Sequence, residues 1–125
     1  MRKLVLALTA IALCGALAVP GVAAGTRAPT TVTIETENGD FWGTVSSPRP
    51  KRCAKDRKIV LYKQVGSEQD PSIDEKVASD TASWSGGAYE WATGNTGMSG
   101  KFYARAKRTE FCKADSSPTV RSVKP

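Results

Sequence analysis

The chain has 125 residues, with 18 lysines and arginines against 12 aspartates and glutamates, a formal net charge of +6 and no histidine. This length holds one ordinary domain with a short leader and leaves little room for a second domain. Without histidine the chain lacks the most common general base and the usual serine–histidine and cysteine–histidine pairs. We therefore expect no enzymatic activity, no catalytic residues and no cofactor.

The first 24 residues have the pattern of a secretory signal peptide. Arg2 and Lys3 precede an uncharged apolar run and a small-residue ending at Ala24. The pattern predicts a leader helix, cleavage after Ala24 and export to the extracellular side. A retained anchor is the alternative, but the apolar run is shorter than the roughly 20 residues that a membrane-spanning helix needs. We therefore expect no stable membrane span after cleavage, a short linker at 25–30 and a domain at 31–125.

Cleavage of the leader removes Cys14 and leaves Cys53 and Cys112 as the two cysteines of the mature chain. An even number of cysteines in an oxidising compartment favours a disulfide. The alternatives are a metal site and a reactive thiol. Two isolated cysteines lack the paired spacing of zinc sites, and a reactive Cys53 would leave Cys112 unpaired as well. The sequence therefore predicts a Cys53–Cys112 bridge and no metal site.

Short segments of β-branched and aromatic residues alternate with turn-forming residues along the rest of the chain, without an amphipathic helical period of useful length. In chain order, strands are predicted at 31–36, 41–47, 58–64, about 76–79, around Tyr89 and Trp91, at 101–109 and within 118–123. Asn38-Gly39 predicts a tight turn after the first strand. The spacing predicts an all-β, antiparallel two-sheet sandwich of about seven strands.

These segments resemble a group of secreted actinobacterial domains of unassigned function, which are similar to carboxypeptidase-regulatory, transthyretin-like modules. The resemblance covers nearly all of residues 31 to 123. Its most specific part is a cysteine just before the central strand combined with a second cysteine after the "GKFYA" strand. Gly100 and Phe102 match a Gly-x-Tyr pattern, with phenylalanine in place of tyrosine. The resemblance implies an Ig-like or transthyretin-like sandwich and export, and it carries no catalytic residues.

One segment departs from the pattern of those modules. Asp80 matches the start of their Asp-x-x-Gly segment, but Ser83 stands where glycine is expected. The resemblance therefore implies a longer turn there, ending at Gly86-Gly87.

Three aromatic residues are candidates for ligand binding, namely Trp42, Trp84 and Tyr89. Trp84 is flanked by serines and glycines, so we expect it in a turn with its ring exposed. An exposed ring can stack on a sugar or an apolar partner; the alternative is that it covers one end of the sandwich. We also expect Trp91 or Tyr89 to pack near the disulfide.

The segment "RPKRCAKDRK" at 49–58 is strongly basic. Its candidates for polyanion binding are Arg49, Lys51, Arg52, Lys55, Arg57 and Lys58. A disulfide to Cys112 would bring them close to the basic residues at 105–113. Envelope polymers and anionic lipid headgroups are suitable ligands, whereas no specific nucleic-acid binding is expected without interleaved aromatic residues. The alternative is a solvated surface that keeps the protein soluble.

Acidic residues gather in the polar segment 68–75, where Asp70, Asp74 and Glu75 could bind calcium. The spacing is not that of a known calcium loop, so a solvated, exposed loop is favoured. Glu35 and Glu37 are predicted on the solvated side of an edge strand.

Together these features predict a secreted, non-enzymatic β-sandwich module with a binding or structural role in the cell envelope or the medium. One alternative is a carbohydrate- or glycopolymer-binding domain that uses the exposed tryptophan and tyrosine rings. Another is an inhibitor of an extracellular hydrolase that presents the loop at 66–75. The expected partner is accordingly an anionic envelope polymer, a polysaccharide or an extracellular protein.

Overall fold

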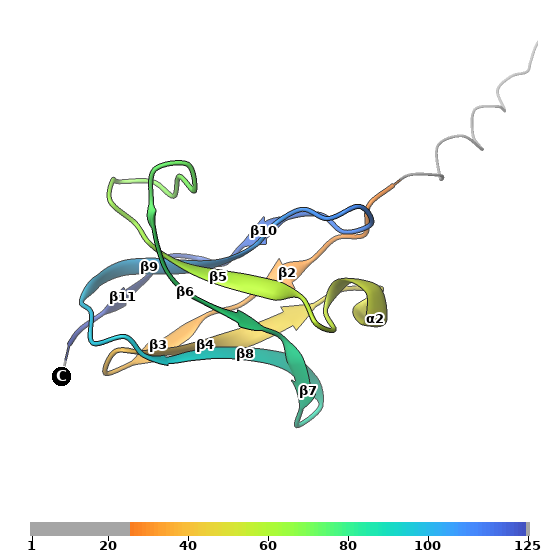
Figure 1. Ribbon diagram of the computed structural model, residues 1–125, viewed down its shortest axis with the longest axis horizontal. Helices are drawn as coiled ribbons and strands as arrows, with labels where there is room; N and C mark the ends of the chain where they lie inside the picture. Colours follow the sequence, from red (N-terminus) through yellow and green to blue (C-terminus); the bar gives the residue numbers. More distant parts are fainter. Residues whose placement is uncertain (1–25, 125) are drawn as a thin grey trace, which may run out of the picture.

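A computed structural model describes residues 26–124, so the predicted signal peptide and its cleavage point lie outside the described residues. Two antiparallel sheets lie face to face (Figure 1). The elements in chain order are β2 (Thr31–Val32), β3 (Glu35–Glu37), β4 (Asp40–Ser46), α2 (Pro50–Cys53), β5 (Lys58–Lys63), β6 (Glu75–Thr81), β7 (Ser83–Ser85), β8 (Ala88–Asn95), β9 (Gly100–Ala106), β10 (Asp115–Ser116) and β11 (Val120–Ser122).

The first sheet has the order β2–β4–β8–β7, with β3 also paired to β4, and the second has the order β10–β9–β5–β6, with β11 also paired to β9. Because β2 and β3 share one neighbour, and β10 and β11 share another, each short pair is one interrupted strand. The predicted all-β, antiparallel two-sheet architecture is confirmed. The turn at Asn38-Gly39 is confirmed as well, since both residues have positive φ angles, 50° and 90°.

A hydroxyl side chain lies at each interruption. Thr33 lies between β2 and β3, and its Oγ1 accepts the backbone N–H of Thr44 at 2.8 Å. Ser117 lies between β10 and β11, and its Oγ accepts the backbone N–H of Ala104 at 2.8 Å. In both cases a side-chain oxygen takes the place of a backbone carbonyl in the ladder, so the strand deviates without leaving this donor unpaired.

The main core lies between the sheets and is built from alternate residues of each strand. The rings of Phe41 and Phe102 meet there, with centroids 4.7 Å apart. Trp91 is fully buried, and its Nε1 donates a hydrogen bond to the Thr33 carbonyl oxygen at 3.1 Å. Gly43 allows this approach, because a Cβ atom there would lie 2.0 Å from the same oxygen.

The structure corrects several sequence-based predictions. The helix α2 was not predicted, and β6 is longer than expected. Residues 83–85 form strand β7 instead of a long turn, and Gly86-Gly87 alone make the turn to β8. The expectation that Trp91 or Tyr89 packs near the disulfide is wrong: Trp91 belongs to the main core and the partly buried Tyr89 packs against that core, whereas the disulfide forms a separate cluster with Ala28.

Two carboxylates connect the edges of the two sheets by hydrogen bonds. At one edge the chain crosses from β6 to β7 through Ala82, which is fully buried, and Asp80 accepts the backbone N–H of Ala92 in β8 at 2.8 Å. At the other edge Asp115 in β10 accepts the backbone N–H of Val32 in β2 at 2.7 Å. Each carboxylate therefore satisfies a backbone donor of the opposite sheet. No helix among residues 26–124 is long and apolar enough to cross a membrane.

Candidate functional site

The predicted disulfide is present at one end of the sandwich. Cys53, the last residue of α2, is bonded to Cys112, with the two Cα atoms 5.6 Å apart. Both cysteines are buried, and the N-terminal segment packs against them. The backbone N–H of Ala28 donates to the Phe111 carbonyl at 2.9 Å, and the N–H of Lys113 donates to the Ala28 carbonyl at 2.8 Å. The bridge therefore joins α2, the segment after β9 and the N-terminal segment.

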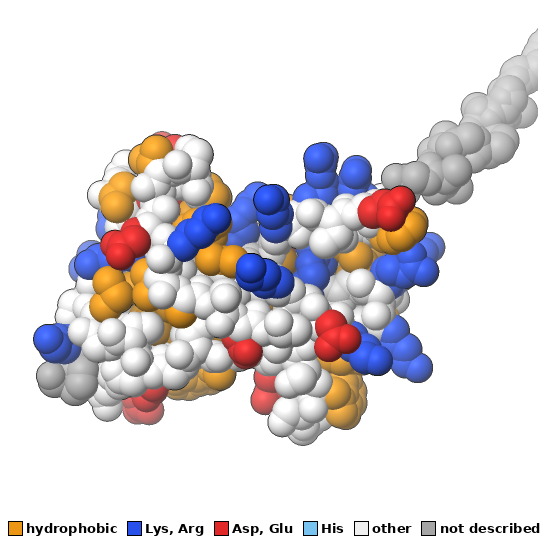
Figure 2. Space-filling model, in the orientation of Figure 1, with side chains coloured by type: hydrophobic (Ala, Val, Ile, Leu, Met, Phe, Trp, Pro, Cys, Tyr) orange, Lys and Arg blue, Asp and Glu red, His pale blue; other side chains and the backbone are white. Residues whose placement is uncertain are grey.

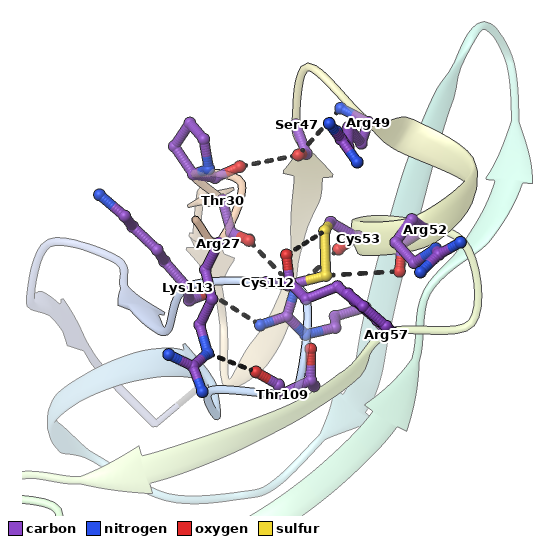
Figure 3. Close-up of a disulfide and its surroundings, with 12 residues drawn as sticks. Arg27, Thr30, Ser47, Arg49, Arg52, Cys53, Arg57, Thr109, Cys112 and Lys113 are labelled. Carbon is purple, nitrogen blue, oxygen red and sulfur yellow. Dashed lines mark hydrogen bonds between the residues drawn. A yellow bond between two sulfur atoms is a disulfide. The ribbon is translucent and has the colours of Figure 1, made fainter. Parts of the chain in front are cut away.

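Arg57 lies beside the disulfide, where its side chain is directed inward (Figure 3). It is only 5% exposed, and its guanidinium group donates four hydrogen bonds of 2.8 to 3.0 Å. The acceptors are the Thr30 hydroxyl and the carbonyl oxygens of Cys53, Lys107 and Lys113. Burial lowers the pKa of Arg57. Arg57 is therefore a structural residue and not part of the exposed polyanion site for which the sequence suggested it.

The other predicted basic residues are exposed, and the disulfide brings them close to a second basic segment. We call this surface the basic end; its cations are Arg49, Lys51, Arg52, Lys55, Lys58, Lys107, Arg108 and Lys113. Figure 2 shows lysine and arginine side chains gathered at the α2 end of the molecule. Two exposed acids, Asp56 and Glu110, lie among them. A hollow of about 460 Å³ shares Lys58 and Lys107 with this surface, and a second hollow of about 480 Å³ is lined by both basic segments.

An exposed aromatic ring lies within the basic end. Phe111 is 46% exposed, and the guanidinium carbon of Arg52 lies 4.3 Å from its ring centroid. This cation–π contact orients Arg52 on the surface without neutralising its charge.

The three aromatic candidates do not form one site. Trp84 in β7 is 64% exposed and meets Tyr89 of β8 edge-on, with ring centroids 5.1 Å apart. These two rings flank a hollow of about 230 Å³ next to Pro50 of α2. Trp42 is 37% exposed but lies on the opposite face of the same sheet, because Phe41 and Val45 of β4 point into the core. The structure therefore brings Trp84 and Tyr89 together and separates Trp42 from them.

Within the acidic loop, Asp74 is not a solvated side chain as the sequence suggested. Asp74 is 7% exposed and accepts hydrogen bonds from the Tyr103 hydroxyl and from the backbone N–H groups of Val65 and Asp70. Burial works to raise the pKa of Asp74, but these donors and Lys101 hold it below its ordinary value. The carboxylate of Asp74 thus fixes the loop in place. Among the described residues no group of three or more histidine, cysteine or acidic side chains is placed to hold a metal ion.

Other side chains of that loop and of the acidic edge strand are exposed. Ile73 at the loop surface is 62% exposed, as a loop that contacts a hydrolase would require. The alternative of a hydrolase inhibitor stays a prediction. Glu35 and Glu37 lie exposed on β3, as predicted for the solvated side of an edge strand.

A second basic surface was predicted only in part from the sequence, which named Lys58, Arg105 and Lys107 but not Lys76. Lys76, Arg105 and Lys107 line a groove with Lys58 on the outer face of the β6–β5–β9 sheet. The alternation of Arg105 and Lys107 with buried alanines in and after β9 indicated a basic outer face. The position of Lys76 opposite Tyr62 depends on strand register, and no local sequence signal gives it.

Comparisons with protein-family models, curated proteins and solved structures found no match for this chain. The resemblance to carboxypeptidase-regulatory, transthyretin-like modules therefore stays a prediction.

Proposed function

We propose that this protein is an exported, non-enzymatic β-sandwich module of the Ig-like or transthyretin-like type that binds an anionic polymer of the cell envelope or its surroundings. The predicted leader supports export, and the disulfide indicates an oxidising setting. The lack of histidine supports a role without general acid–base catalysis. The fold type is supported by a strand order in which β4 pairs with β8 in one sheet and β5 with β9 in the other.

The observation that carries the binding proposal is the joining of two basic segments by the disulfide. Segments 49–58 and 107–113 are distant in sequence, yet the Cys53–Cys112 bond fixes them side by side. Eight exposed cations stand there against two exposed acids. Charges of one sign held on one end of a small domain attract a polyanion more strongly than the same charges dispersed over the surface.

The test is retention of the mature protein on a dextran sulfate column, compared with neutral dextran, over a range of salt concentrations. Retention on the anionic matrix should fall steeply as salt rises, because screening weakens contacts between exposed charges. In the variant Lys51→Gln/Lys55→Gln, two contacts of about 0.5 kcal/mol each are lost, so affinity should fall about fivefold.

The matched control is Arg121→Gln/Lys124→Gln, which removes the same charge from β11 and the C-terminal segment, at the opposite end of the molecule (Figure 1). This variant should bind nearly as well as the natural protein. Equal weakening by both pairs of substitutions, or no retention at low salt, would contradict binding through the basic end.

A second candidate function, carbohydrate binding, is favoured by one observation. The exposed ring of Trp84 is held edge-on against Tyr89 beside a small hollow, so its free face can stack on a sugar ring. If this function holds, Trp84→Ala should abolish sedimentation with insoluble polysaccharide. Trp42→Ala, on the opposite face of the sheet, should leave it unchanged. Sedimentation that survives Trp84→Ala would reject this candidate.

A further inference from the structure

The outer face of the β6–β5–β9 sheet carries a basic groove. In β5, Ile59 and Leu61 point into the core, so Val60 and Tyr62 point away from it. Strand register places Arg105 of β9 opposite Val60 and Lys76 of β6 opposite Tyr62. The loop between β5 and β6 contributes one wall of this face. The result is an open hollow of about 460 Å³, which we call the outer groove.

Among residues 26–124, four cations line the outer groove, namely Lys58, Lys76, Arg105 and Lys107, and no acidic side chain lines it. Figure 2 shows lysine and arginine side chains across the middle of this face, over β5 and β6. Within the described part of the chain, the Arg105 side chain donates one hydrogen bond, from its Nη1 to Ser116 Oγ at 2.8 Å, so its other N–H donors can face a ligand. The groove therefore presents a fixed guanidinium fork among three lysine ammonium groups on flexible stems.

The floor and wall of the outer groove are rigid. Tyr62 in the floor stacks on Tyr103, with ring centroids 5.2 Å apart and an angle of 10° between the ring planes. Tyr103 in turn donates its hydroxyl hydrogen bond to Asp74, which holds the loop that carries Pro71 and Ser72. Because these parts are fixed before a ligand arrives, binding costs little ordering entropy.

We propose that the outer groove binds a phosphorylated sugar, as one unit of a phosphate-bearing polymer. Its volume lies in the range of small-ligand sites, roughly 300 to 1,000 Å³. A phosphate group carries a charge of about −1.5 to −2 and three strong acceptor oxygens, which suits a groove lined by several cations. Val60 and the edge of Tyr62 give the sugar ring an apolar floor, and the Ser72 hydroxyl gives it a polar wall.

Nucleic acid fits this groove less well, although it also carries phosphate. Single strands are held by exposed aromatic rings on which successive bases stack. The one aromatic side chain that lines the outer groove, Tyr62, is 7% exposed and already stacked on Tyr103. This inference rests on the proposed function for the anionic class of ligand, and it adds the chemical unit and the position of the site.

The experiment is a titration of ¹⁵N-labelled mature protein with glucose 6-phosphate, with glucose and inorganic phosphate as separate probes. Glucose 6-phosphate should shift the backbone amide signals of β5, β6 and β9 and bind more tightly than inorganic phosphate, and glucose alone should produce no shifts. Shifts confined to residues 49–55 and 108–113, or equal binding of inorganic phosphate and the sugar phosphate, would overturn the proposal.

The test variant is Lys76→Gln, at a lysine of the outer groove that is not part of the basic end, and the charge-matched control is Lys51→Gln at the basic end. Both lysines are exposed, and the folding of both variants is checked from the dispersion of the amide spectrum. Each lost charge-assisted hydrogen bond should weaken glucose 6-phosphate binding by about tenfold or more, whereas the control should bind within about twofold of the natural protein. Equal weakening of glucose 6-phosphate binding in both variants would show general electrostatic attraction and would overturn the proposal that the outer groove is the binding site.

The two proposals fail in different ways. If the natural protein is retained on dextran sulfate but does not bind glucose 6-phosphate, the outer-groove proposal falls and the proposed function stands. If the protein binds glucose 6-phosphate in the outer groove but is not retained on dextran sulfate, the outer-groove proposal is supported and the proposal of polymer binding through the basic end is rejected.

Discussion

The hydroxyl group of Tyr103 donates a hydrogen bond of 2.5 Å to the carboxylate of Asp74, and both side chains are buried. Asp74 also accepts the backbone N–H groups of Val65 and Asp70, so its charge is solvated by the protein in place of water. Burial and the contact with Asp74 raise the pKa of Tyr103, and the pKa of Asp74 lies below its ordinary value of 3.8. The pair links the β5–β6 loop to the outer face of β9.

This pair predicts acid-sensitive stability. Because folding depresses the pKa of Asp74, its contribution is fully present above about pH 4 and is lost as the pH falls through the folded-state value. Asp74→Asn removes the charge and turns an NH₂ group toward at least one donor, which should cost about 1 to 3 kcal/mol near neutral pH. Denaturant unfolding at pH values of about 6, 4 and 2.5 should show the difference between variant and natural protein shrinking toward acid.

Tyr103→Phe is the companion variant. It keeps the ring stacked on Tyr62 but removes one donor from Asp74, so the pKa of Asp74 should rise toward its ordinary value. Acid unfolding should then begin at a higher pH than in the natural protein. An unchanged acid midpoint would mean that the backbone donors alone hold the carboxylate.

Arg57 predicts a large loss of stability on substitution. Arg57→Met leaves three carbonyl oxygens and the Thr30 hydroxyl without their donor, so unfolding free energy should fall by about 3 kcal/mol or more. Arg57→Lys keeps a charge but cannot reproduce the planar fork, so it should recover only part of this loss. Arg108→Ala, at an exposed arginine, should change stability by less than about 0.5 kcal/mol. The comparison is made by urea unfolding, and full recovery by lysine would contradict the fork geometry.

Gly43 predicts a steric effect in the middle of a strand. In Gly43→Ala the new Cβ atom would lie 2.0 Å from the Thr33 carbonyl oxygen and 2.8 Å from Trp91 Nε1, so the hydrogen bond between them must break or the strands must separate. The thermal midpoint should fall, and the Trp91 indole N–H signal should shift. Gly66→Ala is the control, because a Cβ atom there meets nothing within 4 Å. If Gly43→Ala proves as stable as the control, the strands adjust without cost.

The disulfide predicts resistance to thiol labelling. Alkylation of the protein without reductant should add no label at Cys53 or Cys112, as read from the intact mass. The double variant Cys53→Ser/Cys112→Ser should be less stable by about 4 kcal/mol, on the chain-entropy account of closing a loop of this size. Labelling of both cysteines in freshly isolated protein would contradict the bond in the natural protein.

The strands and the disulfide could be predicted from the sequence because they depend on local signals. Alternation in "KIVLYK" separates Ile59 and Leu61 from Val60 and Tyr62, and the structure buries the first two as the pattern requires. The Asn38-Gly39 turn follows from residues that tolerate positive φ. The cysteine pairing required only the count that remains after the predicted leader is removed.

The candidate site was harder to predict from the sequence, because tertiary contacts define the roles of its residues. A threonine in a β-strand is ordinary, so nothing in the sequence marked Thr33 as an acceptor for Trp91. Arg57 looked like its basic neighbours, but three of the four acceptors that surround it come from segments distant in sequence. Asp74 likewise looked solvated until Tyr103, 29 positions later, was placed against it. Burial of a charged side chain is decided by such partners and not by its immediate neighbours.

The crossing of the chain at Ala82 has a consequence for how the domain unfolds. One continuous segment contributes β6 to the second sheet and β7 to the first, and Ala82 between them exchanges backbone hydrogen bonds with Asp56 and Arg57. If this segment detaches, it therefore exposes β5 at the edge of one sheet and β8 at the edge of the other. Native-state hydrogen exchange should accordingly find the slowest amides of β5 and β8 opening together, as one cooperative unit and not as two separable layers.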